Sequence, residues 1–363
     1  MFQLQLRDDN DVLIAYIDNK VRNISWEWNR IGGCGPCQFQ LIEPFDGAIA
    51  GSLAEDYSIR AYLEGTLWYS GYIDRVAPNV AGKEETINAS CLGYVNQLKR
   101  IIIYNKTYSG MELSAIAKDI LDTYIVPNSN ITSLASDYDD SGFTADSLYF
   151  NENAYEVISK LSDIAGRREW GVRADKSFFF KRRDDSISRY YHIKENFSSF
   201  QPIKDFNPII TRIFLEGGEG YSDIFTVTNR ISLREAIVSN SSIISQSVGQ
   251  QYARMYLKEH GMVKKSYIGT IPNYNTRLEA TLPIGMAAIN LKIGVNYKYD
   301  VATQLYDTGL KYDGGTESFQ IEKIKYTLTD DNLDVTFNFG PVPPDISDDL
   351  KNLEYLISQK GNI

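Results

Sequence analysis

The chain has 363 residues, which is too long for one ordinary hydrophobic core and predicts two or three domains. Its hydrophobic share of 43% and aromatic share of 12% exclude a disordered chain and are typical of an ordered, β-rich protein. A formal net charge of −10 argues against a general binder of nucleic acid or anionic membranes, because clustered Lys and Arg hold those partners.

Residues 1–105 are predicted to form a strand-rich unit. Apolar and polar residues alternate with a period of two over residues 2–6, 12–17, 24–28, 38–42, 57–63, 66–76 and 85–92. Closure of these strands into a barrel would remove their exposed edges. The first residues carry acids where a secretory signal carries bases, and no eighteen apolar residues run together. We therefore expect synthesis in the cytoplasm, without a signal peptide or membrane insertion.

The tetrapeptide Cys34-Gly35-Pro36-Cys37 is identical to the redox motif of thioredoxin. In that motif a helix follows and lowers the pKa of the first thiol, whereas residues 38–42 alternate like a strand. We therefore predict that the four residues form a hairpin loop without a catalytic role. A structural disulfide between Cys34 and Cys37 remains open, and Cys91 is predicted to be a small core residue.

Residues 106–200 are predicted to form an α/β region that ends where Pro202 and Pro208 interrupt the chain. The expected elements are a helix opened by a capping box from Ser109 to Glu112, a polar stretch over 128–141, a helix from Asn153, and a hairpin over 169–172 and 177–181. Gly166 stands where the end of the second helix would need glycine. Asp175 lies in the expected turn of the hairpin.

Residues 201–344 are predicted to form a second strand-rich, barrel-like unit with one inserted helix. The expected strands cover residues 209–215, 224–229, 231–238, 263–271, 286–299, 319–327 and 333–339. The helix carries aliphatic and aromatic residues four apart and is followed by Gly261.

Residues 345–363 form the last predicted unit, a short C-terminal helix that follows Pro341, Pro343 and Pro344. Its apolar residues fall on one helical face: Ile346, Leu350, Leu353 and Ile357. The stripe covers two heptads, so it is a candidate interface for pairing with other copies or for docking onto its own chain.

The sequence contains few of the motifs that are typical of catalytic or metal-binding sites. It has two His, no HExxH, no nucleophile elbow and no phosphate loop, and its acidic clusters lack the pattern of a calcium loop. We therefore expect no enzyme activity, no cofactor and no metal site. The local basic cluster of Arg167, Arg168, Arg182 and Arg183, with Lys181, is a candidate contact with another protein.

Two motifs resemble the baseplate-hub proteins of long-tailed bacteriophages, also called tail-associated or late-control-D-like proteins. A strand pair carries Trp68, Gly71, Ile73 and Asp74. The helix and hairpin of the middle region then carry Ala165, Gly166, Glu169, Trp170, Gly171, Val172, Asp175, Phe179 and Arg182. The resemblance covers residues 60 to 185 and implies an α+β, β-rich fold, with two tail-tube-like β-barrel domains and an α/β region inserted between them.

The resemblance also implies a function. It predicts a structural baseplate hub at the tail tip of the virion, a homotrimer that closes or extends the tail tube and connects a distal tail ring to tip or fibre proteins. Two barrels in each of three chains would match a sixfold tube. DNA would pass through the lumen without specific binding, and acidic side chains facing the lumen would repel its phosphates.

Beside a thiol oxidoreductase at Cys34 and Cys37, two other function classes remain as alternatives. Glycoside hydrolysis needs only two carboxylates, so a tail-borne hydrolase of cell wall or polysaccharide is one alternative. A carbohydrate-binding module that recognises a host receptor through the many Tyr residues is the other.

Overall fold

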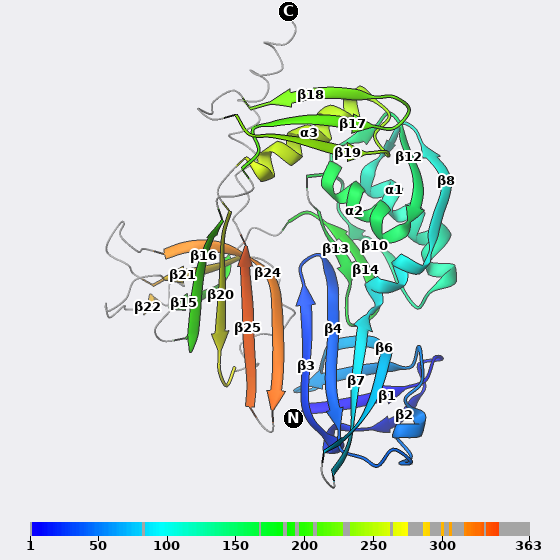
Figure 1. The fold of residues 1–363 in the computed structure, drawn as a ribbon, viewed down its shortest axis with the longest axis vertical. Helices are drawn as coiled ribbons and strands as arrows, with labels where there is room; N and C mark the ends of the chain where they lie inside the picture. The colour runs from blue at the N-terminus through cyan, green and yellow to red at the C-terminus, as the bar shows by residue number, and fades with distance from the viewer. Residues whose placement is uncertain are drawn as a thin grey trace, which may run out of the picture.

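The computed structural model describes residues 2–81, 84–166, 168–183, 187–192, 196–205, 209–227, 233–261, 264–274, 286–290, 299–300, 305–306, 316–329 and 332–340. One end of the molecule is built from strands, and the helices gather at the other end (Figure 1). The predicted C-terminal helix, with Ile346, Leu350, Leu353 and Ile357, lies outside the described residues, as does Arg167.

A large, mainly antiparallel sheet joins the N-terminal and C-terminal parts of the chain. The N-terminal part contributes β1 (Phe2–Arg7), β2 (Leu13–Tyr16), β3 (Val21–Asn29), β4 (Gly32–Leu41), β5 (Ser58–Leu63), β6 (Thr66–Ala81) and β7 (Glu84–Gly93). The C-terminal part contributes β16 (Ser199–Asp205), β20 (Lys264–Ile271), β24 (Thr316–Thr329) and β25 (Asn332–Gly340). Among the described residues the order is β16-β20-β25-β24-β3-β4-β7-β6-β5-β1-β2.

The expectation of two closed barrels is not met in the described part of the chain. The outer edge of β3 pairs with β24 from Asn23↔Thr329 to Asn29↔Lys323, so strands from opposite ends of the chain share one sheet. Barrel closure would need each unit to satisfy its own edges, whereas here an edge of one unit satisfies an edge of the other. The strand-rich character predicted from the sequence is confirmed.

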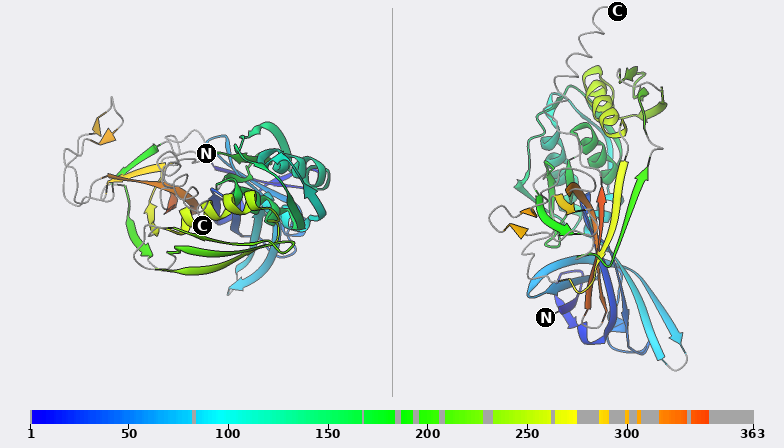
Figure 2. Two further views of the ribbon diagram at one scale, coloured as in Figure 1. Left: turned by 90° about the horizontal axis from the view of Figure 1, so that it is seen from above. Right: turned by 90° about the vertical axis from the view of Figure 1, so that its left-hand side faces the viewer.

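A first core of aromatic and aliphatic side chains, here called the terminal core, lies between these strands. Trp26 stacks on Tyr326 with ring centroids 5.3 Å apart, and Trp68 meets the same tyrosine edge-on at 5.3 Å. Phe2 stacks on Trp26 from β1, which shows that the sheet curls over its own core. The right-hand view in Figure 2 shows the curl of the N-terminal strands. Residues from both ends of the chain therefore complete one hydrophobic core.

The rest of the fold is an α/β layer. Its helices are α1 (Leu113–Ile120), α2 (Ala154–Ile164) and α3 (Gln246–His260). Its strands are β8 (Ile102–Tyr108), β9 (Met111–Glu112), β10 (Thr132–Tyr138), β11 (Thr144–Ala145), β12 (Leu148–Asn153), β13 (Glu169–Val172), β14 (Ser177–Lys181), β17 (Arg212–Gly217), β18 (Ser222–Thr226) and β19 (Glu235–Asn240). Four strands complete the described chain: β15 (Ile187–His192), β21 (Met286–Asn290), β22 (Tyr299–Asp300) and β23 (Leu305–Tyr306).

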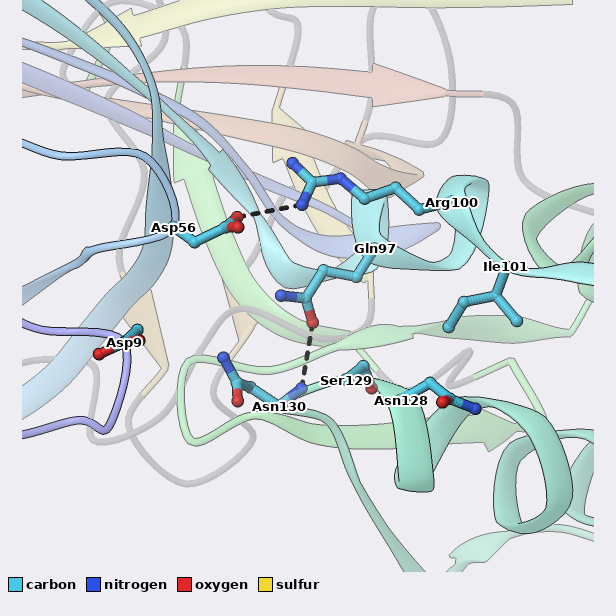
Figure 3. Close-up of a pocket in the computed structure, with 8 residues that line it drawn as sticks. All are labelled: Asp9, Asp56, Gln97, Arg100, Ile101, Asn128, Ser129 and Asn130. Carbon is cyan, nitrogen blue, oxygen red and sulfur yellow. Dashed lines mark hydrogen bonds and ion pairs between the residues drawn. The ribbon is translucent and has the colours of Figure 1, made fainter.

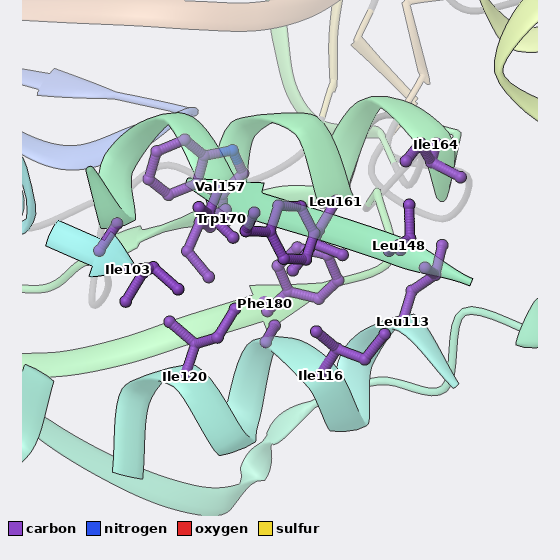
Figure 4. Packing of buried hydrophobic residues seen from close by; sticks show 14 of the residues in the cluster. Ile103, Leu113, Ile116, Ile120, Leu148, Val157, Leu161, Ile164, Trp170 and Phe180 are labelled. Carbon is purple, nitrogen blue, oxygen red and sulfur yellow. The ribbon is translucent and has the colours of Figure 1, made fainter. Parts of the chain in front are cut away.

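A second core, the middle core, holds this layer together. Side chains of α1 and α2 meet Trp170 and Phe180 of the hairpin in a buried cluster (Figure 4). Ile213, Leu215 and Val238 belong to the same cluster, although they lie in the unit predicted over residues 201–344. The middle core therefore crosses the predicted boundary near residue 200.

Two local predictions differ from the structure. The first helix begins at Leu113 and not after Ser109, because Glu112 serves as its N-cap and accepts a hydrogen bond from the backbone N of Ala115 at 2.9 Å. The polar stretch over 128–141 contains β10, which pairs in parallel with β14. Parallel pairing to a distant strand leaves no local signal in a polar sequence.

Candidate functional site

A buried arginine marks the point where the two cores meet. Arg30 lies in the turn between β3 and β4 and is 2% exposed. Its Nε donates to Oε1 of Glu169 at 2.7 Å, and its Nη1 lies 3.4 Å from Oε1 of Glu322. Its backbone N also donates to the carbonyl oxygen of Glu322 at 2.9 Å. One side chain thus ties the N-terminal strands, the middle hairpin and the C-terminal strands together.

Glycines let two backbones cross beside this arginine. Gly171 of β13 pairs with Gly32 of β4 in parallel, and a Cβ on Gly33 would overlap the carbonyl oxygen of Val172. A Cβ on Gly93 would overlap the carbonyl oxygen of Cys34 in the same crossing. Gly33 also has φ +74°, a left-handed conformation that favours glycine. Gly171 belongs to the motif that resembles hub proteins, and the close approach of Gly32 explains why this position of the motif is a glycine.

We call this arrangement of Arg30, its two glutamates and the crossing glycines the joint. A buried ion pair is costly to break, because removal of one partner leaves an uncompensated charge away from water. The crossing backbones allow no side chain between them, which fixes the two cores relative to one another. The motif that resembles hub proteins contains Glu169 and Gly171 of the joint, whereas Arg30 was not among the candidate residues of the sequence.

The tetrapeptide from Cys34 to Cys37 lies inside β4, so the prediction of a hairpin loop is wrong. The turn falls at Arg30 and Ile31, because Gly32 (φ +106°) and Gly33 adopt the left-handed conformations that the bend needs. A bulge in the pairing with β3 places both thiols on the core side of the sheet.

All three cysteines are free thiols and buried. Residues three apart in a strand have Cα atoms roughly 10 Å apart, whereas a disulfide needs less than about 7 Å. The candidate Cys34 to Cys37 disulfide is therefore not formed in this conformation. Burial raises the pKa of Cys34 to about 12 and raises the pKa of Cys37 well above its ordinary value, with a hydrogen bond to Cys91 as a further cause. The thiols of Cys34 and Cys37 therefore stay protonated at neutral pH, and a protonated thiol is a poor nucleophile.

The predicted basic cluster does not form one exposed face. Arg168 is buried, and its Nη2 donates to the carbonyl oxygen of Asp140 at 2.8 Å. Burial lowers the pKa of Arg168, and the charge of Arg182 lowers it further. Arg182 is exposed, whereas Lys181 and Arg183 are half-buried. The part of the cluster left for a partner protein is thus smaller than the sequence suggested.

An open pocket of about 350 Å³ lies where the β1–β2 turn approaches the helical turn at Tyr94–Arg100 (Figure 3). Arg100 and Asp56 form an ion pair across it at 3.0 Å, and Oε1 of Gln97 accepts from the backbone N of Asn130 at 3.3 Å. The guanidinium of Arg100 also lies over the ring of Tyr72. Its charged and amide groups are therefore largely engaged with one another.

Exposed apolar side chains gather on strands that form edges or open faces. Val12, Leu13, Ile14 and Tyr16 are exposed on and beside β2, which ends the large sheet in the described part of the chain. Ile224 and Ile237 are exposed on β18 and β19. Exposed apolar residues on an edge strand favour pairing with another chain.

The described residues contain no group of three or more His, Cys, Asp or Glu that could hold a metal ion. No helix within the described ranges is both long and apolar enough to cross a bilayer.

Solved structures of tail proteins share this fold over nearly the whole chain. The 43 kDa tail protein of prophage MuSo2 from Shewanella oneidensis is 12% identical with a TM-score of 0.66, covering 93% of this chain and 98% of its own. The tail protein from Neisseria meningitidis MC58 is 10% identical with a TM-score of 0.64, covering 94% and 96%. The prophage tail protein gp18 from Listeria monocytogenes EGD-e is 11% identical with a TM-score of 0.53, covering 98% and 99%.

No family model matches the chain, and no curated protein sequence matches it. The resemblance inferred from the two motifs is nevertheless confirmed at the level of the fold, because the similarity extends far beyond residues 60 to 185. The chain has the fold of phage tail proteins.

Proposed function

We propose that this protein is a structural, non-enzymatic hub at the tip of a bacteriophage tail. In this proposal three copies form a ring that closes or extends the tail tube, with a distal tail ring on one side and tip or fibre proteins on the other. Residues 1–105 and the strands of 201–344 in the large sheet supply the tube-like units, and residues 106–200 supply the inserted α/β region.

The observation that carries the proposal is the fold shared with tail proteins over at least 93% of this chain and 96% of theirs for the two matches with the higher TM-scores. Because the similarity covers nearly all of both chains, the two tail proteins contain few residues outside the shared fold. Both of these similar proteins are tail proteins. Fold alone does not imply function, so the tail role is inferred from the likeness together with the architecture.

The architecture suits a ring that must resist load. The large sheet runs from β16 to β2 without interruption among the described residues, and the joint couples it to the α/β layer through Arg30. The exposed apolar strand β2 offers an edge that a neighbouring copy could extend, since paired edges close a sheet around an axis. An acidic lumen would then let DNA slide by repelling its phosphates.

Mass in solution tests the ring. We expect native mass spectrometry and sedimentation to give three chains of 41.1 kDa. Ile14→Asp places a carboxylate on the β2 edge and should shift the mass to one chain, because a buried unpaired charge is costly. Tyr104→Asp is the matched control, since Tyr104 is 76% exposed on β8, and it should leave three chains. A single chain for the unmodified protein at micromolar concentration would contradict the trimer.

A further inference from the structure

Two of the buried cysteines face each other across neighbouring strands. Cys37 of β4 is the direct register partner of Cys91 of β7 in an antiparallel pair. Direct partners in such a pair have Cα atoms about 4.5–5.5 Å apart and side chains on the same face of the sheet. This spacing lies within the range of about 4.4–6.8 Å between Cα atoms that a disulfide needs. The sheet therefore holds the two cysteines at a distance that a disulfide can bridge.

The side chains of this pair point toward one another. A hydrogen bond joins the thiols of Cys37 and Cys91. Cys37 is 1% exposed, Cys91 is 0% exposed, and both belong to the terminal core. The two thiols are therefore neighbours on the core side of the sheet.

Cys34 is offset from this pair. It lies beside Gly93, where an added Cβ would overlap the carbonyl oxygen of Cys34. Gly93 is two residues beyond Cys91, and diagonal neighbours across two strands lie about 7–8 Å apart, which is too far for a disulfide. Register thus favours Cys37 over Cys34 as the partner of Cys91.

We propose that Cys37 and Cys91 form a cross-strand disulfide in an oxidising medium, and that this bond stabilises the fold by joining β4 to β7. The oxidant is a small disulfide such as oxidised glutathione. The thiolate of one cysteine attacks it and releases one reduced glutathione, and the thiolate of the other cysteine then displaces the second. The chain loses two protons and two electrons, and the oxidised glutathione gains both.

Burial determines when the bond forms. The folded chain encloses both thiols, so glutathione reaches them only while the sheet is open. A glutathione attached to one cysteine has no room in a close-packed core. Pairing of β4 with β7 therefore favours the second exchange step, which expels the glutathione. This inference does not depend on the proposed tail function, because it concerns two strands of a single chain.

Peptide mapping tests the pairing. The reduced protein is held near the midpoint of its urea unfolding with oxidised and reduced glutathione, returned to buffer, alkylated, and digested with trypsin without reduction. Cleavage after Arg30, Arg60, Lys83 and Lys99 places Cys37 in residues 31–60 and Cys91 in residues 84–99. We expect these two peptides to be linked in at least about half of the chains, with an intact mass lower by about 2 Da. Absence of the link, or a link between two chains, would overturn the proposal.

Two variants identify the partner of Cys91, because residues 31–60 contain both other cysteines. Cys34→Ala should link at the yield of the unmodified chain, and Cys37→Ala should not link. Fragmentation of the linked peptides between Gly35 and Pro36 in the mass spectrometer separates the two cysteines and gives the same assignment without a variant. A link that runs through Cys34 would overturn the proposal.

Oxidation in fully denaturing urea is the control for the role of the fold. The unfolded chain should close the shorter loop between Cys34 and Cys37, which leaves residues 31–60 and 84–99 unlinked. An equal yield of linked peptides in denaturing urea would mean that β4 and β7 do not direct the pairing, and this result would also overturn the proposal.

Thermal unfolding measures the effect of the bond. The disulfide closes a loop of roughly 50 residues and so restricts the unfolded chain. The oxidised unmodified protein and oxidised Cys34→Ala should each melt about 5 °C above the same protein kept in dithiothreitol. Cys37→Ala should melt at one temperature under both conditions. An oxidised, linked chain that melts no higher than the reduced chain would contradict the stabilising role.

Discussion

The two cores of this molecule are assembled from different parts of the chain. The terminal core combines residues 4–91 with residues 174–339, so it forms only when both ends of the chain meet. The middle core draws on residues 72–257 and is built largely from helices and hairpins that lie close in sequence. Local patterns of apolar residues can therefore specify the middle core. The terminal core depends on pairing between distant strands, which a local sequence pattern does not show.

The joint connects the two cores. It places Arg30 from the terminal core against Glu169 from the middle core, and it carries Glu322 from the last strands. If the two cores act as one body, damage at the joint should lower the stability of both. If they are independent, each should unfold on its own.

The largest effect is expected from Gly33→Ala. A methyl group there meets the carbonyl oxygen of Val172 and must adopt a left-handed φ, so we expect a loss of about 3–4 kcal/mol in the free energy of unfolding. Gly65→Ala separates the two causes, because Gly65 also has a positive φ but nothing within 4 Å, and it should cost about 1 kcal/mol. Urea unfolding of both variants measures the difference. Equal losses would mean that the close crossing is not a constraint.

Glu169→Gln is expected to cost about 3 kcal/mol, because it leaves the buried guanidinium of Arg30 without its main counter-charge. Unfolding should remain a single transition when far-UV and near-UV circular dichroism are followed together. The control is Glu84→Gln at the exposed pair with Arg22, where about 0.5 kcal/mol is expected. Two separated transitions in the Glu169→Gln protein would show that the cores are independent bodies.

Tyr326→Leu tests the packing of the terminal core. The variant loses the stacking with Trp26 and the edge contact with Trp68, and we expect a loss of about 2 kcal/mol. Tyr104→Leu on the exposed part of β8 should change stability by less than about 0.5 kcal/mol. Differential scanning calorimetry measures both. Equal melting temperatures for the two variants would contradict the stacked arrangement between the chain ends.

At neutral pH the smallest effect on stability comes from the thiols of the terminal core, because it appears only in alkaline solution. Burial raises the pKa of Cys34 from 9.0 to about 12, so the folded chain keeps a proton that the unfolded chain releases above about pH 9. This contribution to stability is complete below pH 9 and is lost as the pH rises toward 12. We expect Cys34→Ala to lose less stability over that pH range than the unmodified protein. A thiol reagent at pH 8 should react with none of the three cysteines until urea unfolds the chain, and prompt reaction would contradict their burial.

The sequence predicted the elements better than their connections. The long strands of residues 319–327 and 333–339, the helix from Asn153 and the hairpin after it are close to the structure, because their patterns are periodic and their turns are marked. The pairing of β3 with β24 could not be predicted, since alternation shows which face of a strand is buried and does not name its neighbour.

The candidate site was predictable only in part. Gly171 stood in the recognised motif, yet its role depends on the close approach of Gly32, which is 139 residues away. The sequence around Arg30 does not indicate a buried ion pair, because its partners Glu169 and Glu322 are far away along the chain. The error at Cys34 to Cys37 has a related cause, because a bulge keeps both thiols on the core side where simple alternation would place them on opposite faces.

Hydrogen exchange of β3 and β24 tests the central claim most directly. Because these strands pair over residues 23–29 and 323–329, their amides should become exposed together, at the rate of global unfolding, when followed by mass spectrometry in the native protein. Gly33→Ala should accelerate both strands by the same factor. Exchange in β24 that is orders of magnitude faster than in β3 would contradict a single sheet closed by the two ends of the chain.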